Sequence, residues 1–278
     1  MKYAVVYGLA PNKAGFEETL IFAKKAGYEG IELSAIPMIE GRARPIDNKE
    51  IDKLCEQAKQ TASVVRKRGL EVMGFAPGAF ALNYFDDVVF ENYYRLAQAL
   101  GSPSLKLYGT LYDPSRGTYW DLFKENQRKL KAILKYGGKY GVRSLLELHF
   151  GTLNESCSAA YHIMKDFDPK LIGVIHDPQN MVIAGKESWR MGLEILGDYL
   201  AYVHWKDSCF KKDKDGLWKW EICGLNEGLV NWKEFIGALK ATGFNGYLCN
   251  EFRGDMDQVS SDVYLENELR IMKSLVET

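Results

Sequence analysis

Short, continuous apolar runs recur along the chain and alternate with longer amphipathic stretches. Apolar runs without polar alternation are typical of strands that are buried on both faces of a parallel sheet. They predict strands at Tyr3–Tyr7, Gly30–Leu33, Leu70–Phe75, Ser104–Tyr108, Arg143–His149, Leu171–Ile175, Leu200–Trp205 and Gly246–Phe252. The stretches between them predict helices near 15–26, 47–68, 86–100, 119–140, 155–166, 187–197, 231–242 and 260–275.

Strict alternation of strands and helices predicts a parallel α/β sheet, and eight such units predict closure into a barrel. We therefore expect a single-domain (β/α)8 TIM barrel over residues 1–278, an ordinary length for a fold of about 250 residues. An open doubly wound sheet is the alternative, but no Gly-x-Gly-x-x-Gly follows the first predicted strand. Residues 206–230 form the longest stretch without periodicity and are expected to be a functional loop.

Composition and charge narrow the class of protein. The chain is 46% hydrophobic and 26% charged, which is typical of a soluble globular protein. Its 36 Lys and Arg balance 37 Asp and Glu, so it lacks the basic surplus of a nucleic-acid-binding protein. No apolar run reaches the roughly 18 residues that span a bilayer, and the N-terminus lacks a signal-peptide layout. We expect a cytoplasmic protein without a membrane or nucleic-acid partner. The five cysteines form no CxxC pair, so neither a disulfide framework nor a zinc-thiolate site is expected.

The last four predicted strands each end near a residue that can bind a metal ion. These residues are Glu147, Asp177, His204 and Glu251. The carboxyl ends of barrel strands meet at one end of the barrel, where active sites of this fold lie. Buried carboxylates are costly unless they are paired, and one divalent cation would be a common partner for all of them. Three carboxylates and one imidazole suit Mn²⁺, Mg²⁺ or Co²⁺ better than a structural zinc. Each residue alone also fits a packing or hydrogen-bonding role, so the prediction rests on the four together.

Six short motifs follow one another along nearly the whole chain. They are Gly-Tyr-Glu-Gly-Ile-Glu-Leu at 27–33, Leu-Glu-Leu-His at 146–149, His-Asp-Pro-Gln-Asn-Met at 176–181, Val-His-Trp-Lys-Asp at 203–207, Gly-Leu-Asn-Glu-Gly-Leu-Val-Asn-Trp at 224–232 and Asn-Glu-Phe at 250–252. In order and spacing, they resemble the sugar phosphate isomerase/epimerase family, the xylose isomerase-like barrels that include ketose 3-epimerases and hydroxypyruvate isomerase. The resemblance implies one divalent metal ion per chain, bound by Glu147, Asp177, His204 and Glu251. Mn²⁺ is the preferred ion, with Mg²⁺, Co²⁺ or Zn²⁺ as alternatives.

The reaction that this resemblance implies is isomerisation or epimerisation of a ketose, a sugar phosphate or a related small hydroxy-carbonyl compound. A proton beside a ketone moves through an enediolate, which a divalent metal would stabilise as a Lewis acid. Glu147 and Glu251 are the expected catalytic pair, one removing the proton and the other returning it on the opposite face. A metal-dependent dehydratase of a sugar-like acid or inosose begins with the same step and stays open. A homo-oligomer also stays open.

Further residues are candidates for substrate binding. His149 lies two residues beyond Glu147, so it is expected to point the same way and either contact a sugar hydroxyl or orient Glu147. Lys206 shares a strand face with the predicted histidine ligand and could hold a substrate oxygen or phosphate, or be a surface lysine. Glu32 ends the second strand, where it could hold substrate or shape the pocket. Glu227, in the long loop, is expected at the pocket edge or in solvent.

Two positions depart from the family pattern. Many ketose 3-epimerases carry a histidine three residues after the strand-six aspartate and an arginine six residues after the strand-seven histidine, and both contact substrate. This chain has Asn180 and Phe210 there. The Asn180 amide can still hydrogen-bond a hydroxyl. His176 precedes a predicted metal ligand and is expected to face the helices instead.

Two other classes of protein share this barrel or its ligands. The trinuclear-metal DNA-repair endonucleases need further histidines on early strands, but the first histidine here is His149, and the charge is near neutral. A non-catalytic metal or sugar sensor would keep the ligands without turnover. Two carboxylates in proton-transfer positions favour an enzyme.

Overall fold

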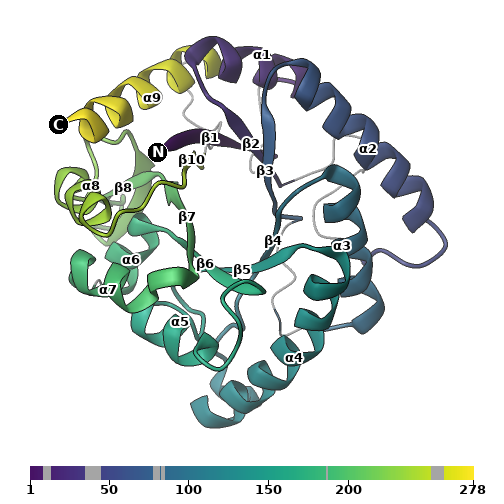
Figure 1. Cartoon of the computed structure of the whole chain (residues 1–278). Helices are drawn as coiled ribbons and strands as arrows, with labels where there is room; N and C mark the ends of the chain where they lie inside the picture. Colours follow the sequence, from purple (N-terminus) through teal and green to yellow (C-terminus); the bar gives the residue numbers. More distant parts are fainter. Residues whose placement is uncertain (9–13, 35–44, 78–81, 83–84, 186, 252–259) are drawn as a thin grey trace.

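The computed structural model describes residues 1–8, 14–34, 45–77, 82, 85–185, 187–251 and 260–278. Its centre is a closed barrel of parallel strands in the order β1-β10-β7-β6-β5-β4-β3-β2 (Figure 1). The barrel strands are β1 (Lys2–Tyr7), β2 (Gly30–Leu33), β3 (Glu71–Phe75), β4 (Ser104–Leu107), β5 (Arg143–Glu147), β6 (Ile172–His176), β7 (Leu200–Trp205) and β10 (Tyr247–Asn250). The predicted single-domain (β/α)8 barrel is confirmed.

Helices surround the barrel and cover its outer face (Figure 1). They are α1 (Phe16–Ala26), α2 (Ile51–Lys67), α3 (Asp87–Leu100), α4 (Tyr119–Tyr140), α5 (Cys157–Met164), α6 (Pro178–Ala184), α7 (Trp189–Leu196), α8 (Trp232–Ala241) and α9 (Ser261–Glu277), with short 3-10 turns at Pro114–Arg116 and Gly197–Tyr199. All but α6 lie where the sequence predicts a helix. No helix in the described part of the chain has both the length and the apolar character needed to cross a membrane.

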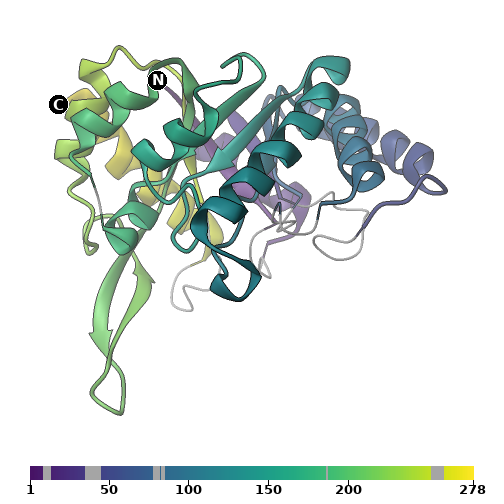
Figure 2. The ribbon, with the colours of Figure 1, turned by 90° about the horizontal axis from the view of Figure 1, so that it is seen from below.

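The sequence suggested an irregular loop over residues 206–230, but the structure shows regular strands within this stretch. Residues Asp207–Lys212 (β8) and Trp218–Cys223 (β9) pair as an antiparallel hairpin outside the barrel. Figure 2 shows this hairpin extending well beyond the end of the barrel. Phe210 pairs with Trp220 across the hairpin, and the Trp220 ring lies 6.0 Å from the ring of Phe150, in the loop after β5. The hairpin therefore contacts the loop at the carboxyl end of β5.

The interior of the barrel holds its own small apolar cluster, separate from the larger core between strands and helices. Its buried members are Ala4, Val6, Met73, Leu145, Ile175, Tyr202 and Cys249. Four of them, on β5, β6, β7 and β10, stand two residues before Glu147, Asp177, His204 and Glu251. Because side chains alternate along a strand, the four predicted ligands form the next inward layer, at the carboxyl end of the barrel.

All five cysteines are free thiols in the structure. Cys157, Cys223 and Cys249 are buried, and Cys249 lines the barrel interior. They contribute to packing rather than to covalent cross-links.

Candidate metal centre

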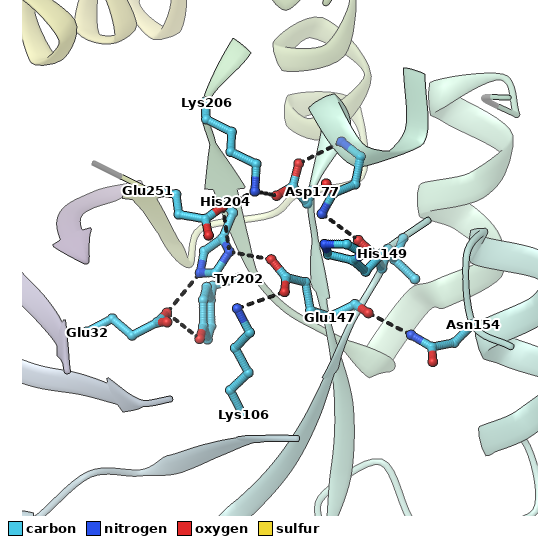
Figure 3. Close-up of polar contacts among 12 residues, drawn as sticks. Glu32, Lys106, Glu147, His149, Asn154, Asp177, Tyr202, His204, Lys206 and Glu251 are labelled. Carbon is cyan, nitrogen blue, oxygen red and sulfur yellow. Dashed lines mark hydrogen bonds and ion pairs between the residues drawn. The ribbon is translucent and has the colours of Figure 1, made fainter. Parts of the chain in front are cut away.

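Glu147, Asp177, His204 and Glu251 converge at the carboxyl end of the barrel, and their side chains point toward one another (Figure 3). All four are buried, and one potential ligand atom from each lies within 4.8 Å of those of the others. Nδ1 of His204 lies 3.0 Å from Oε1 of Glu147 and 3.9 Å from Oε2 of Glu251. The structure therefore brings together the four residues that the sequence singled out.

Asp177 has one oxygen committed to the fold and one directed to the cluster. It is the N-cap of α6, where its Oδ1 accepts a hydrogen bond of 3.0 Å from the backbone N–H of Asn180. Its Oδ2 is buried and accepts no hydrogen bond of good geometry within the described chain, although Nζ of Lys206 lies 2.7 Å away as an ion pair. A buried carboxylate oxygen without a well-formed hydrogen bond is the kind of atom that a metal ion satisfies.

Lys106, on β4, is a member of the cluster that the sequence analysis did not single out. Its Nζ lies 2.7 Å from Oε2 of Glu147. Burial alone would raise the pKa of Glu147, but the charge of Lys106, followed by His204, outweighs it and holds that pKa well below its usual value. The signal in the sequence was a lysine inside the otherwise apolar strand Ser104–Tyr108, which needs a buried partner for the same reason as a carboxylate does.

Lys206 bridges two of the predicted ligands. Its ammonium contacts Oε2 of Glu251 as well as Oδ2 of Asp177. Burial would raise the pKa of Glu251, but Lys206 outweighs it and brings the pKa to about 2. For Asp177, burial prevails over the attraction of Lys206, and the pKa is raised. Glu251 is therefore ionised at neutral pH.

His204 is held from behind by a second carboxylate. Its Nε2 lies 2.9 Å from Oε2 of Glu32, which also accepts a hydrogen bond of 2.6 Å from the hydroxyl of Tyr202. Burial would lower the pKa of His204, but the charge of Glu32 and the hydrogen bond to Glu147 raise it to about 10. Burial likewise would raise the pKa of Glu32, but His204 lowers it. A carboxylate on the far nitrogen of a histidine fixes the ring for metal binding through the near nitrogen.

The other predicted substrate-binding residues lie in different settings. His149 is half-buried, with Nδ1 2.9 Å from the carbonyl oxygen of Phe150 and its ring 5.2 Å from that of Tyr108. Asn180 is buried, and its Nδ2 donates to the carbonyl oxygen of Leu148 over 3.0 Å. Glu227 is exposed between β9 and α8.

The sequence also pointed to His176, which precedes Asp177, and to Phe210. His176 faces the helices, as predicted, with its ring 5.1 Å from Phe235 and 6.0 Å from Trp189. Phe210, at the position of the family's arginine, is exposed on β8.

The donor set fits a divalent cation. Three carboxylates and one imidazole around a common point provide the hard, mainly oxygen coordination that Mn²⁺ or Mg²⁺ prefers. Oδ2 of Asp177, which accepts no well-formed hydrogen bond within the described residues, supports the same interpretation. Lys106 and Lys206 also place positive charge against these acids.

Comparison with known proteins gives the following similarities. The family model described as xylose isomerase-like TIM barrel matches residues 20–275. An inosose dehydratase of Lactiplantibacillus plantarum is 23% identical over 199 residues, which are 59% of this chain and 66% of that relative, so the match covers slightly less than two thirds of that protein.

Solved structures with this fold include two epimerases at low sequence identity. A 3-keto-D-glucoside 4-epimerase from E. coli superposes with a TM-score of 0.72 at 16% identity, covering 99% of both chains. A D-psicose 3-epimerase from Clostridium cellulolyticum, solved with D-tagatose, superposes with a TM-score of 0.73 at 16% identity, covering 100% of both chains.

Proposed function

Because the chain belongs to the xylose isomerase-like TIM barrel family, we propose that it is a divalent-metal-dependent sugar isomerase or epimerase. Its substrate is a ketose, a sugar phosphate or a related small hydroxy-carbonyl compound, and the reaction moves a proton at a carbon beside the carbonyl. The observation that carries this proposal is the meeting of Glu147 and Glu251 with Asp177 and His204 in one buried cluster at the carboxyl end of the barrel.

The metal ion would be held by Glu147, Asp177, His204 and Glu251. When bound, it would polarise the substrate carbonyl as a Lewis acid and orient the neighbouring oxygens. Mn²⁺ is our first choice, because the donor set is three carboxylates and one imidazole. Glu32 and Tyr202 would keep His204 in the orientation that directs Nδ1 into the site.

The proton would be moved by the two glutamates. Glu147 ends β5 and Glu251 follows β10, and two strands, β6 and β7, stand between them in the barrel. This separation supports access to opposite faces of a bound sugar. Both carboxylates have lowered pKa values and are ionised at neutral pH, so either can accept a proton. The hand of the substrate decides which one is the base and which, once protonated, is the acid.

The test replaces each glutamate by the amide of the same shape. Glu147→Gln and Glu251→Gln should both abolish net interconversion, because an amide cannot accept the substrate proton. The variant that keeps the base for one substrate hand should still exchange that substrate's proton with D₂O, as seen by NMR. The other variant should not, and the pattern should reverse for the opposite hand.

Glu266→Gln is the matched control. Glu266 is exposed on α9, outside the cluster, so this variant should react like the wild type. If both cluster variants turn over at nearly the wild-type rate, the proposed two-glutamate mechanism is wrong.

A dehydratase of a sugar-like acid or inosose is the second candidate. It is supported by the similarity to an inosose dehydratase. Dehydration would begin with the same proton removal by Glu147 or Glu251, but a neighbouring hydroxyl would then leave as water. An ultraviolet-absorbing enone product would favour dehydration, and a non-absorbing stereoisomer would favour epimerisation.

A further inference from the structure

Lys206 reaches into the metal-ligand cluster from the strand that carries His204. It stands two residues beyond His204, so it continues the inward-facing positions of β7, and its side chain is only 6% exposed. Figure 3 shows its stem descending toward Glu251 and Asp177. Its ammonium contacts both carboxylates. Because Lys206 contacts two of the predicted ligands at once, its ammonium occupies a place where a metal ion would contact the same groups.

The contact with Asp177 makes this competition direct. Oδ1 of Asp177 is taken by the N-cap hydrogen bond to the backbone N–H of Asn180. Oδ2 is therefore the oxygen left to coordinate an ion, and it is the oxygen that lies 2.7 Å from Nζ of Lys206. A cation coordinated there would stand close to the ammonium, and two like charges at such a distance repel each other strongly in a buried site.

Lys106 provides an internal comparison. Among the described residues it forms an ion pair only with Oε2 of Glu147, while Oε1 of that glutamate faces Nδ1 of His204. Glu147 therefore keeps one oxygen that neither Lys106 nor Lys206 pairs with. Of these two lysines, Lys206 holds two of the four ligands and the last available oxygen of one of them.

We propose that the ammonium of Lys206 is an internal cation that holds the metal-free site together and leaves Asp177 and Glu251 when a divalent ion binds. Lysine suits this exchange, because it is a single point charge on a flexible four-carbon stem. After displacement, the amine stays tethered beside the ion, within reach of a substrate oxygen. This inference rests on the proposed metal centre.

The test measures metal affinity without using activity. Lys206→Met keeps the apolar stem and removes the charge. Isothermal titration with Mn²⁺ should give a dissociation constant at least about tenfold lower for Lys206→Met than for wild type, a difference of about 1.4 kcal/mol. Thermal unfolding should show a lower Tm for the metal-free variant and a larger rise in Tm on adding Mn²⁺, because the wild type exchanges one cation for another.

Two controls and a second variant complete the design. Lys139→Met removes an exposed charge from the last turn of α4, at the opposite end of the barrel, and should leave the Mn²⁺ affinity unchanged. Lys206→Arg keeps the charge and should not tighten binding. Lys206→Gln can still hydrogen-bond to both carboxylates without a charge, so it provides the same affinity test if Lys206→Met does not fold without metal.

The outcomes distinguish a failure of the Lys206 inference from a failure of the proposed metal centre. If wild type binds Mn²⁺ but neither uncharged variant binds it more tightly, Lys206 does not compete with the ion, and this inference fails while the proposed metal centre stands. If wild type and variants all fail to bind Mn²⁺, the metal centre is refuted, and the inference fails with it.

Discussion

Glu32 should set the metal affinity of the site through His204, although it is not one of the four predicted ligands. Its buried Oε2 lies 2.9 Å from Nε2 of His204 and accepts a hydrogen bond from the hydroxyl of Tyr202 over 2.6 Å. Glu32→Gln keeps the shape but removes the charge that fixes the imidazole. Partners of this kind typically change metal affinity by about 10- to 100-fold, so we expect Mn²⁺ binding to weaken by about 1.4–2.7 kcal/mol.

The size of the effect can be checked against a second variant that removes only the hydrogen bond from Tyr202 to Glu32. Tyr202→Phe leaves the carboxylate on His204 and removes only the hydroxyl, a loss of about 1 kcal/mol for one hydrogen bond, or about fivefold in affinity. Isothermal titration with Mn²⁺ should therefore rank the proteins in the order wild type, Tyr202→Phe and Glu32→Gln, from tightest to weakest. Glu266→Gln, the same chemical change on the exposed face of α9, should bind like wild type.

The same experiment decides whether Glu32 holds substrate, the other role that the sequence suggested. If Glu32 binds substrate, Glu32→Gln would raise KM and leave the Mn²⁺ dissociation constant unchanged. If Glu32 instead positions His204, Glu32→Gln would weaken Mn²⁺ binding, and excess Mn²⁺ would restore kcat. An unchanged Mn²⁺ affinity in Glu32→Gln would refute the positioning role.

Three further predictions concern the metal ligands, the loop before α8 and a buried acid on α9. His204→Ala and Asp177→Asn should lose activity chiefly through loss of metal, and excess cation should partly restore it; full metal occupancy of an inactive variant, by elemental analysis, would contradict this. Gly228→Ala should destabilise the protein by about 3 kcal/mol and lower Tm by about 6–12 °C, because the new Cβ would lie 1.8 Å from Cγ of Asp207, a buried and hydrogen-bonded carboxylate. A loss of unfolding free energy below about 0.5 kcal/mol in urea would contradict this prediction. Burial, aided by nearby acids, raises the pKa of Glu268 from 4.5 to about 7. Between about pH 4.5 and pH 7 the carboxyl therefore stays protonated in the folded protein but ionises in the unfolded chain, so the stability of the wild type should fall by about 3 kcal/mol relative to Glu268→Gln. A wild-type and variant pair with parallel stability curves over this pH range would contradict it.

The barrel could be predicted because its strands are buried on both faces and therefore appear as continuous apolar runs. Arg143–His149, for example, contains β5 with two further residues at its carboxyl end. The same regularity explains the candidate site, since a polar residue two positions beyond a buried inward residue must point into the next layer. The sequence pointed to Asp177 and His204 as residues at the ends of predicted strands, and the structure places them two residues after the inward-facing Ile175 and Tyr202.

The parts that sequence patterns missed depend on contacts between distant segments. The hairpin of β8 and β9 has a charged turn around Asp213–Gly216 and much exposed surface, so neither burial nor periodicity marks its strands. Helix α6 begins with proline and has only seven residues, fewer than periodicity can identify. A lysine inside an apolar strand indicates that Lys106 needs a buried partner, but that partner, Glu147, lies 41 positions away on the next strand, and no local pattern identifies it.

We propose that Glu147, Asp177, His204 and Glu251 form one divalent-metal site. Its most direct test is anomalous diffraction from crystals of the protein grown with excess Mn²⁺. We predict one Mn²⁺ per chain at the carboxyl end of the barrel, coordinated by these four side chains, with Lys206 turned away from Asp177 and Glu251. A crystal without bound Mn²⁺, or with Mn²⁺ coordinated only by other side chains, would contradict the claim.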